Sequence, residues 1–142
     1  MNVLARTLDA RSVGLSAVGK LAAADVATLL ALVLAGELRH AVDVVGNPGR
    51  VLVTAAPFLL GWFLVAALVG AYGDRAFAGG VDTAKLTVGA WLGGAGIGLT
   101  LRGTSYLAGD SPLSFALVMM GLGSLALGVV RPLVVSRLGA RA

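Results

Sequence analysis

Four long apolar runs, separated by short polar segments, dominate the pattern of this chain. They occupy about residues 21–38, 51–72, 84–101 and 113–135. Each run has about 18–23 residues, and a helix of that length, rising ~1.5 Å per residue, can cross a hydrocarbon core of ~30 Å. Gly, Pro, Asn and Asp fill the segments between the runs and are typical of turns. We therefore predict four helices with short loops, at about residues 21–40, 51–73, 83–102 and 112–135.

The composition favours a membrane location for these helices. Apolar residues make up 58% of the 142 residues and charged residues 13%, against roughly 45–50% and roughly 25% in soluble proteins. A bilayer acts as an apolar solvent for surface that a short soluble chain would have to hide. The sequence therefore predicts an all-α, integral membrane four-helix bundle. We expect one domain over residues 20–137, with an arm at 1–19, a tail at 138–142 and the lipid bilayer as the first partner.

Basic residues are distributed unevenly over the predicted loops. With four crossings, one side holds both termini and the middle loop. That side carries eight basic residues, namely Arg6, Arg11, Lys20, Arg75, Lys85, Arg131, Arg137 and Arg141. The other side carries three, namely Arg39, Arg50 and Arg102. Because cytoplasmic loops are the ones rich in Lys and Arg, we expect a protein of the cell membrane with both termini cytoplasmic.

A cleaved signal peptide is the rival interpretation of the first apolar run. Residues 33–35, Val-Leu-Ala, loosely resemble a cleavage site. The run is long for a signal peptide, however, and it contains Asp25. A retained membrane helix is therefore the better interpretation.

Two glycine-rich segments match nucleotide-binding motifs only in part. Residues 14–20 fit the first seven places of a P-loop, but Leu21 stands where Ser or Thr should hold magnesium. The second segment, residues 93–98, lies inside an apolar run. There, spacing by four puts Ala90, Gly94 and Gly98 in a smooth groove suited to a neighbouring helix. Candidate counterparts on the other helices are Ser124, Gly128, Ala66 and Gly70.

The residue types that carry chemistry are scarce. The chain has no cysteine and one histidine, which leaves no disulfide, thiolate metal site or cysteine nucleophile. The sequence contains no Ser/His/Asp grouping, so an enzyme is the least favoured class. The net charge of +4 is located at the ends of apolar runs, where it orients membrane helices. We expect no cofactor, no bound metal and no nucleic-acid partner.

One acidic residue lies inside the first apolar run. An ionised carboxylate at Asp25 is costly in hydrocarbon unless it faces the bundle or has a partner. Lys20 and Arg131 near the same end are candidate partners, with Tyr72 at the same level. Two interpretations remain for this inner cluster. It is a proton or cation site, or a structural carboxylate paired with a basic residue, and the structural interpretation is the simpler one.

A second polar cluster is predicted at the outer end of the first helix. Glu37, Arg39 and His40 end the first run, and Arg102 ends the third. Guanidinium groups suit carboxylate or phosphate, and histidine changes charge near neutral pH, so this is the favoured binding site of the two clusters. The simpler alternative is a salt bridge of Glu37 with Arg102 or Arg39. Asp43 shares a helix face with Glu37 and His40, but one histidine with two carboxylates is a weak metal signature.

Helix two contains a proline inside its apolar run. Pro57 removes one backbone hydrogen bond and is expected to kink the helix, which could open a pocket beside the outer cluster. Trp62 and Trp91 fall near the middle of the bilayer rather than at its surfaces. We expect both side chains to point into the bundle, where the indole N–H can find an acceptor.

Several of these residues form a wider pattern. It consists of Asp25, Arg39 with His40, residues 56–62 (Ala-Pro-Phe-Leu-Leu-Gly-Trp), Leu101 with Arg102, and Phe115 with Val118. In this pattern the chain resembles an uncharacterised family of small four-helix prokaryotic membrane proteins, the domain of unknown function numbered three-zero-five-four, over about residues 23–131. That family tends to have an aromatic residue before the last arginine, where this chain has Val130. The resemblance implies the four-helix fold and no particular activity.

These observations leave two main classes of function. The first is an accessory or structural membrane subunit, held through its glycine faces to a second copy of the chain or to an unknown membrane partner. The alternative is a small oligomeric transporter, or an ion or proton permeation module, that uses Asp25.

Overall fold

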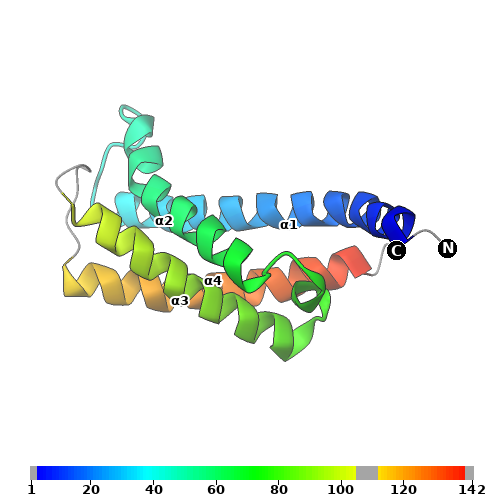
Figure 1. Ribbon diagram of the computed structural model, residues 1–142. Helices are drawn as coiled ribbons and strands as arrows, with labels where there is room; N and C mark the ends of the chain where they lie inside the picture. Colours follow the sequence, from blue (N-terminus) through cyan, green and yellow to red (C-terminus); the bar gives the residue numbers. More distant parts are fainter. Residues whose placement is uncertain (1–2, 105–111, 140–142) are drawn as a thin grey trace.

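The structure is a computed structural model that describes the backbone of residues 3–104 and 112–139, with side chains over residues 14–104 and 112–138. It contains α1 (Val3–Arg39), α2 (Pro48–Val69), the 3-10 helix η1 (Asp74–Phe77), α3 (Gly80–Arg102) and α4 (Leu113–Gly139). The described residues contain no strand, so the all-α, four-helix prediction is confirmed. The start of α1, the end of α4 and the turn that carries η1 lie at one end of the bundle (Figure 1).

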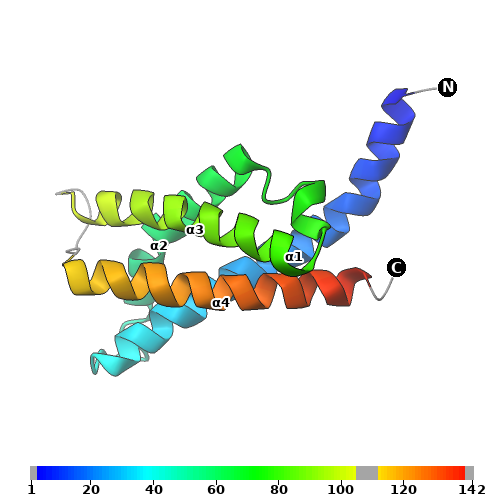
Figure 2. The ribbon, with the colours of Figure 1, turned by 90° about the horizontal axis from the view of Figure 1, so that it is seen from below.

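Helix α1 is longer than the sequence suggested. It starts at Val3, so most of the expected arm, residues 1–19, continues the same helix. That segment contains no proline to stop a helix, and its N-terminal part projects away from the other helices (Figure 2). The P-loop-like residues 14–20 are therefore helical and cannot form a phosphate-binding loop. Residues 1–2 and 140–142, and the side chains of Arg6, Arg11 and Arg141, lie outside the described residues.

The turn after α2 folds the chain back against the helices. Pro48 occupies the first turn of α2, where its missing N–H is harmless. At the other end Gly70 adopts a left-handed conformation with φ of 71°, which glycine tolerates without strain. The N–H of Ala71 then donates to the carbonyl of Ala66 at 2.8 Å, as in a Schellman-type cap. This reversal places Ala71 and Tyr72 against the helices instead of in solvent.

Helices α2 and α3 approach each other through glycine. A Cβ added to Gly94 would lie 2.9 Å from the Cα of Trp62, and one added to Gly98 would lie 2.7 Å from Cδ1 of Phe58. The counterpart on α2 is Gly61, where an added Cβ would lie 2.2 Å from the carbonyl oxygen of Gly94. From the sequence, Gly61 was expected only as part of the family-like segment 56–62 and not as a packing residue. Ala90 is buried on the same face of α3.

Helix α4 packs on the other side of α3. An added Cβ at Gly128 would lie 3.3 Å from Cγ2 of Val88, so this glycine lies at the α3–α4 contact. Ser124 is half-buried, and its hydroxyl has no hydrogen-bond partner among the described residues. A further contact comes from Gly123, which makes room for the Trp91 ring, since an added Cβ would lie 2.2 Å from Nε1.

Aromatic side chains fill the centre of the bundle. Trp62 and Trp91 are buried, with ring centroids 6.4 Å apart, and Phe58 lies 6.2 Å from Trp91. The indole N–H of Trp91 donates to the carbonyl of Met119 at 3.0 Å. Both tryptophans therefore point inward, as predicted. Pro57 is buried inside a continuous α2, and the kink expected there stays a prediction.

Among the described residues, three helices are long and apolar enough to cross a membrane. They are residues 14–39 of α1, all of α2, and residues 113–138 of α4. Large apolar side chains such as Leu52, Leu68 and Leu125 are exposed along them. Helix α3 is not in this group, because glycine and threonine take many of its positions. Its 23 residues pack against both α2 and α4.

Candidate functional site

A fully buried ion pair connects the first and last helices. Asp25 on α1 and Arg131 on α4 are both 0% exposed. Nε of Arg131 lies 2.9 Å from Oδ1 of Asp25, and Nη2 lies 3.3 Å from Oδ2. The guanidinium group therefore donates two hydrogen bonds to the two carboxylate oxygens, a bidentate arrangement that is among the strongest for this pair.

Helical periodicity explains why both side chains point inward. Residues four apart lie on one helix face, and Leu21 and Leu29, four residues before and after Asp25, are each 0% exposed. Leu127 and Val135 flank Arg131 in the same way and are also buried. The apolar pattern thus drives each charged side chain into the bundle, because it shares a face with residues that must be buried.

The remaining donors of Arg131 are directed at α3 and at the turn after α2. Nη2 donates to the carbonyl oxygen of Ala71 at 2.9 Å. Nη1 lies 3.4 Å from the hydroxyl oxygen of Thr87, and that hydroxyl donates in turn to the carbonyl of Thr83 at 2.7 Å. The guanidinium group of Arg131, which α4 carries, therefore contacts α1, α3 and the turn that follows α2.

Aromatic side chains complete the shell around the ion pair. The hydroxyl of Tyr72 donates to Oδ2 of Asp25 and accepts from the indole N–H of Trp62 at 3.0 Å. The guanidinium carbon of Arg131 lies 5.1 Å from the ring centroid of Trp62 and 5.0 Å from that of Tyr72. Both distances are in the range of cation–π attraction. We call Asp25, Arg131, Tyr72, Trp62 and Thr87 the inner network.

Tyr72, which lies outside the apolar helices, is held in its protonated form. Burial raises its pKa above the ordinary value of 10.0, and the hydrogen bond to Asp25 raises it further. A neutral phenol can donate to the carboxylate, whereas a phenolate would repel it. At neutral pH the tyrosine therefore acts as a fixed donor.

The inner network includes residues that the sequence predicted and others that it did not. Asp25 and Arg131 are brought together, with Tyr72 beside them. Lys20 is exposed. Of the two candidate partners of Asp25, the structure therefore shows Arg131. Thr87 and the Ala71 carbonyl were missed, because neither residue type carries a signal in the sequence. Trp62 was expected only to point inward and find an acceptor.

The outer polar residues do not gather as the sequence suggested. Glu37 is 8% exposed and accepts from Nε of Arg50 at 3.1 Å and from the hydroxyl of Thr54 at 2.8 Å. The expected partners were Arg102 or Arg39. Arg39 and His40 are exposed. The guanidinium carbon of Arg102 lies 4.8 Å from the ring centroid of Phe115 on α4.

The outer turn also contains the remaining acidic residue of the predicted cluster. Oδ1 of Asp43 accepts from the backbone N–H of Gly46 at 2.8 Å, which stabilises the turn. Within the described ranges, no group of three His, Cys, Asp or Glu side chains is placed to hold a metal ion. The outer cluster thus divides into a Glu37–Arg50–Thr54 contact between α1 and α2 and an Arg102–Phe115 contact between α3 and α4.

In the part of the chain that the structure describes, the protein is an apolar helical bundle closed around one fully buried ion pair. The family described as "Protein of unknown function (DUF3054)" matches residues 22–134 of the 142. The chain belongs to this family, as its sequence pattern suggested. No curated protein and no solved structure matches it.

Proposed function

We propose that this chain is a multi-pass protein of the cell membrane, with both termini cytoplasmic, that serves as an accessory or structural membrane subunit. The observation that carries the proposal is the inner network, in which a buried ion pair fastens four helices at one end. We call this arrangement a clamp. A clamp of this kind suits a rigid part that presents fixed surfaces to a partner.

Membrane insertion is supported by the distribution of apolar side chains. Residues 14–39, α2 and α4 expose many large apolar side chains around the outside of the bundle, which a bilayer would cover. Helix α3 would be the fourth crossing. Its small residues let it fit closely against α2 and α4, so it needs less apolar surface of its own.

The cytoplasmic placement of the termini rests on the basic residues, with one adjustment. Arg131 is fully buried and paired with Asp25, so it is not an interfacial charge. Removing it from the eight basic residues on the side of the termini leaves seven, against three on the other side. The imbalance keeps its direction and still supports both termini inside.

The clamp is favoured over an ion-coupled site because both carboxylate oxygens of Asp25 already accept hydrogen bonds within the protein. Its two oxygens receive hydrogen bonds from Arg131 and Tyr72. A cation would have to displace the guanidinium group, which would leave an unpaired charge in a buried place. A transporter that uses Asp25 remains the alternative, since ionisable residues inside membranes are often functional.

Purification from native membranes in mild detergent tests the proposal. An accessory subunit is expected to elute with another membrane protein, or with a second copy of itself, at a fixed ratio. Asp25→Asn should weaken this assembly together with thermal stability. A stable monomer that retains a small cation, and loses only that cation in Asp25→Asn, would contradict the proposal and favour the transporter.

A further inference from the structure

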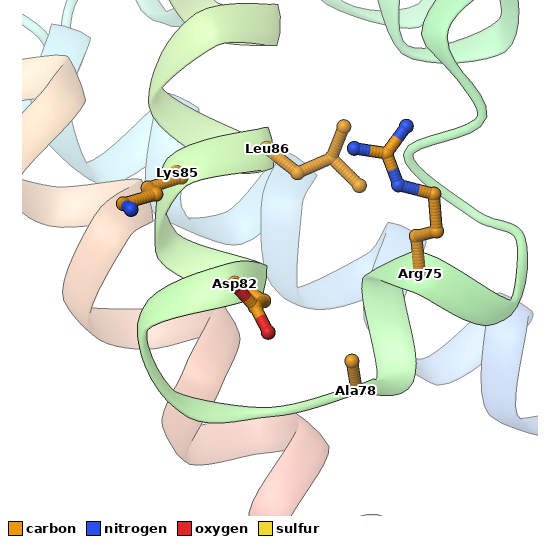
Figure 3. A pocket seen from close by; sticks show the side chains of 5 residues that line it. All are labelled: Arg75, Ala78, Asp82, Lys85 and Leu86. Atoms are coloured by element: carbon orange, nitrogen blue, oxygen red, sulfur yellow. The ribbon is translucent and has the colours of Figure 1, made fainter.

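An open hollow lies beside the turn that follows α2. It consists of two adjoining parts of about 290 Å³ and about 280 Å³, which share Arg75, Lys85 and Leu86 as lining residues. Figure 3 shows the first part between η1 and the start of α3. Arg75 and Leu86 extend toward each other, Asp82 points into the space, and Lys85 stands on the far side of α3.

The lining changes from charged to apolar along α3. The first part is lined by Arg75, Asp82 and Lys85, together with Ala78 and Leu86. The second continues to Val69, Gly89 and Ala90. Gly89 is exposed, and an added Cβ there would meet no atom within 4 Å. A molecule that fits the whole hollow therefore needs a charged end and an apolar end.

Charges of both signs line the first part, and they do not neutralise one another. In the part of the chain that the structure describes, the side chains of Arg75, Asp82 and Lys85 form no ion pair or hydrogen bond. These groups lie at the end of the bundle that holds the start of α1 and the end of α4 (Figure 1). In the membrane orientation proposed above, that end is at the level of the lipid headgroups of the cytoplasmic leaflet.

We propose that this hollow binds a phospholipid with a primary ammonium headgroup, of the phosphatidylethanolamine class. Arg75 suits the phosphate, because a guanidinium group can offer two parallel N–H donors to phosphate oxygens. Asp82 accepts hydrogen bonds from the ammonium group, which has three donors. One acyl chain lies over Leu86 and Gly89 toward Val69. The assignment rests on the proposed insertion of the chain in a membrane.

Native mass spectrometry of the detergent-purified protein tests this assignment. Phosphatidylethanolamine, phosphatidylglycerol and phosphatidylcholine with identical acyl chains are added separately, and the apparent Kd of each is measured. The ethanolamine lipid is expected to bind tightest. Loss of one charge contact should weaken its binding about fivefold, for Arg75→Gln and for Asp82→Asn alike. Asp82→Asn should leave the binding of phosphatidylglycerol unchanged or stronger.

Two matched controls separate the hollow from general effects. Arg137→Gln removes an exposed cation of α4, and we expect it to leave binding unchanged. Gly89→Leu fills the apolar part and should weaken lipid binding at least fivefold. Gly121→Leu makes the same change on α4, where an added Cβ also meets nothing within 4 Å, and should have no effect. Equal thermal stability of the two leucine variants would show that the difference is not one of folding.

Several outcomes would overturn the assignment. They are tighter binding of phosphatidylglycerol or phosphatidylcholine, no effect of Asp82→Asn, and equal effects of Gly89→Leu and Gly121→Leu. Soluble phosphoethanolamine that binds as tightly as the lipid would show that the apolar part contributes nothing. If the chain is found outside the membrane fraction, the proposed function fails as well. If it inserts but binds all three lipids equally, only this assignment fails.

Discussion

At the scale of single residues, the inner network shows how a buried charge is tolerated. Moving each ion out of water costs several kcal/mol, and only good geometry with further hydrogen bonds offsets that cost. Arg131 meets this condition through Asp25, the Ala71 carbonyl and Thr87. The second oxygen of Asp25 is met by Tyr72 as well. The side chains that surround the pair therefore matter as much as the pair itself.

Replacing Tyr72 tests this dependence. Tyr72→Phe keeps the ring but removes the donor to Asp25 and the acceptor for the Trp62 indole. We expect a loss of about 1–3 kcal/mol in the free energy of unfolding, the usual effect of leaving a buried polar group without its partner. Thermal or denaturant unfolding in detergent measures the change. Thr100→Val is the control, since Thr100 is exposed and its hydroxyl donates to the carbonyl of Gly96 in the same helix. Equal stability of the two variants would contradict the role of Tyr72.

The same variant makes a prediction about pH. The folded-state pKa of Tyr72 is raised above its ordinary value of 10.0, so the folded protein holds this proton more tightly than the unfolded chain. The stability that Tyr72 contributes is therefore fully present below about pH 10 and declines as the pH rises further. We expect the difference between wild type and Tyr72→Phe to be constant from about pH 6 to 9 and to shrink above about pH 10. A difference that grows above that pH would show the opposite shift.

Single residues also show what the sequence could and could not predict. Asp25 stood out because a carboxylate inside an apolar helix needs a partner. Lys20 could not be that partner, because five residues along a helix correspond to a rotation of ~500°, which leaves it ~140° away from Asp25. The short connection between α1 and α2 returns Arg50 to Glu37, whereas Arg102 lies over Phe115. Choosing among arginines required the arrangement of all four helices.

At the scale of helices, glycine decides which elements touch. Gly94 and Gly98 were predicted to form a packing face, and the structure places Gly61 and Phe58 of α2 against them. The groove could be predicted because spacing by four is a property of one helix. Its partner could not, because pairing depends on how helices are arranged in space. The extended α1 was missed for a different reason, since polarity and not a helix-breaking residue suggested the boundary near residue 20.

Adding bulk at Gly98 tests the α2–α3 contact. In Gly98→Leu the first added atom would lie 2.7 Å from Cδ1 and 3.0 Å from Cα of Phe58. Because the backbone of α2 would have to move, we expect a loss of about 1–3 kcal/mol in the free energy of unfolding, as is typical of overpacking. Gly121→Leu serves as the control, since its surroundings are open. Equal unfolding temperatures for the two variants would show that the Gly98 face is not packed against α2.

At the scale of the whole molecule, topology and charge suggest one orientation. The start of α1, the end of α4 and the η1 turn lie together at one end (Figure 1), as expected for an even number of crossings. The basic residues at this end outnumber those at the opposite end, even after Arg131 is set aside. The inner network lies nearest to the turn that carries Tyr72, so the clamp would close the cytoplasmic half of the bundle.

Reporter fusions test the orientation. A reporter that is active only in the cytoplasm is fused to each terminus in turn, and its activity is measured in intact cells with the protein in the membrane fraction. We expect activity at both ends, because the basic side of a membrane protein faces the cytoplasm. A fusion to the loop between α1 and α2 should be silent. A silent reporter at either terminus would contradict the proposed topology.

A double-mutant cycle on Asp25 and Arg131 tests whether the ion pair clamps the bundle. Unfolding free energies are measured in mild detergent for Asp25→Asn, Arg131→Met and the double variant. Each single change leaves one uncompensated buried group, so each should cost about 3–5 kcal/mol. The double variant should lose much less than the sum, because neither charge is left alone. Single variants as stable as wild type, or losses that simply add, would show that the pair does not hold the helices together.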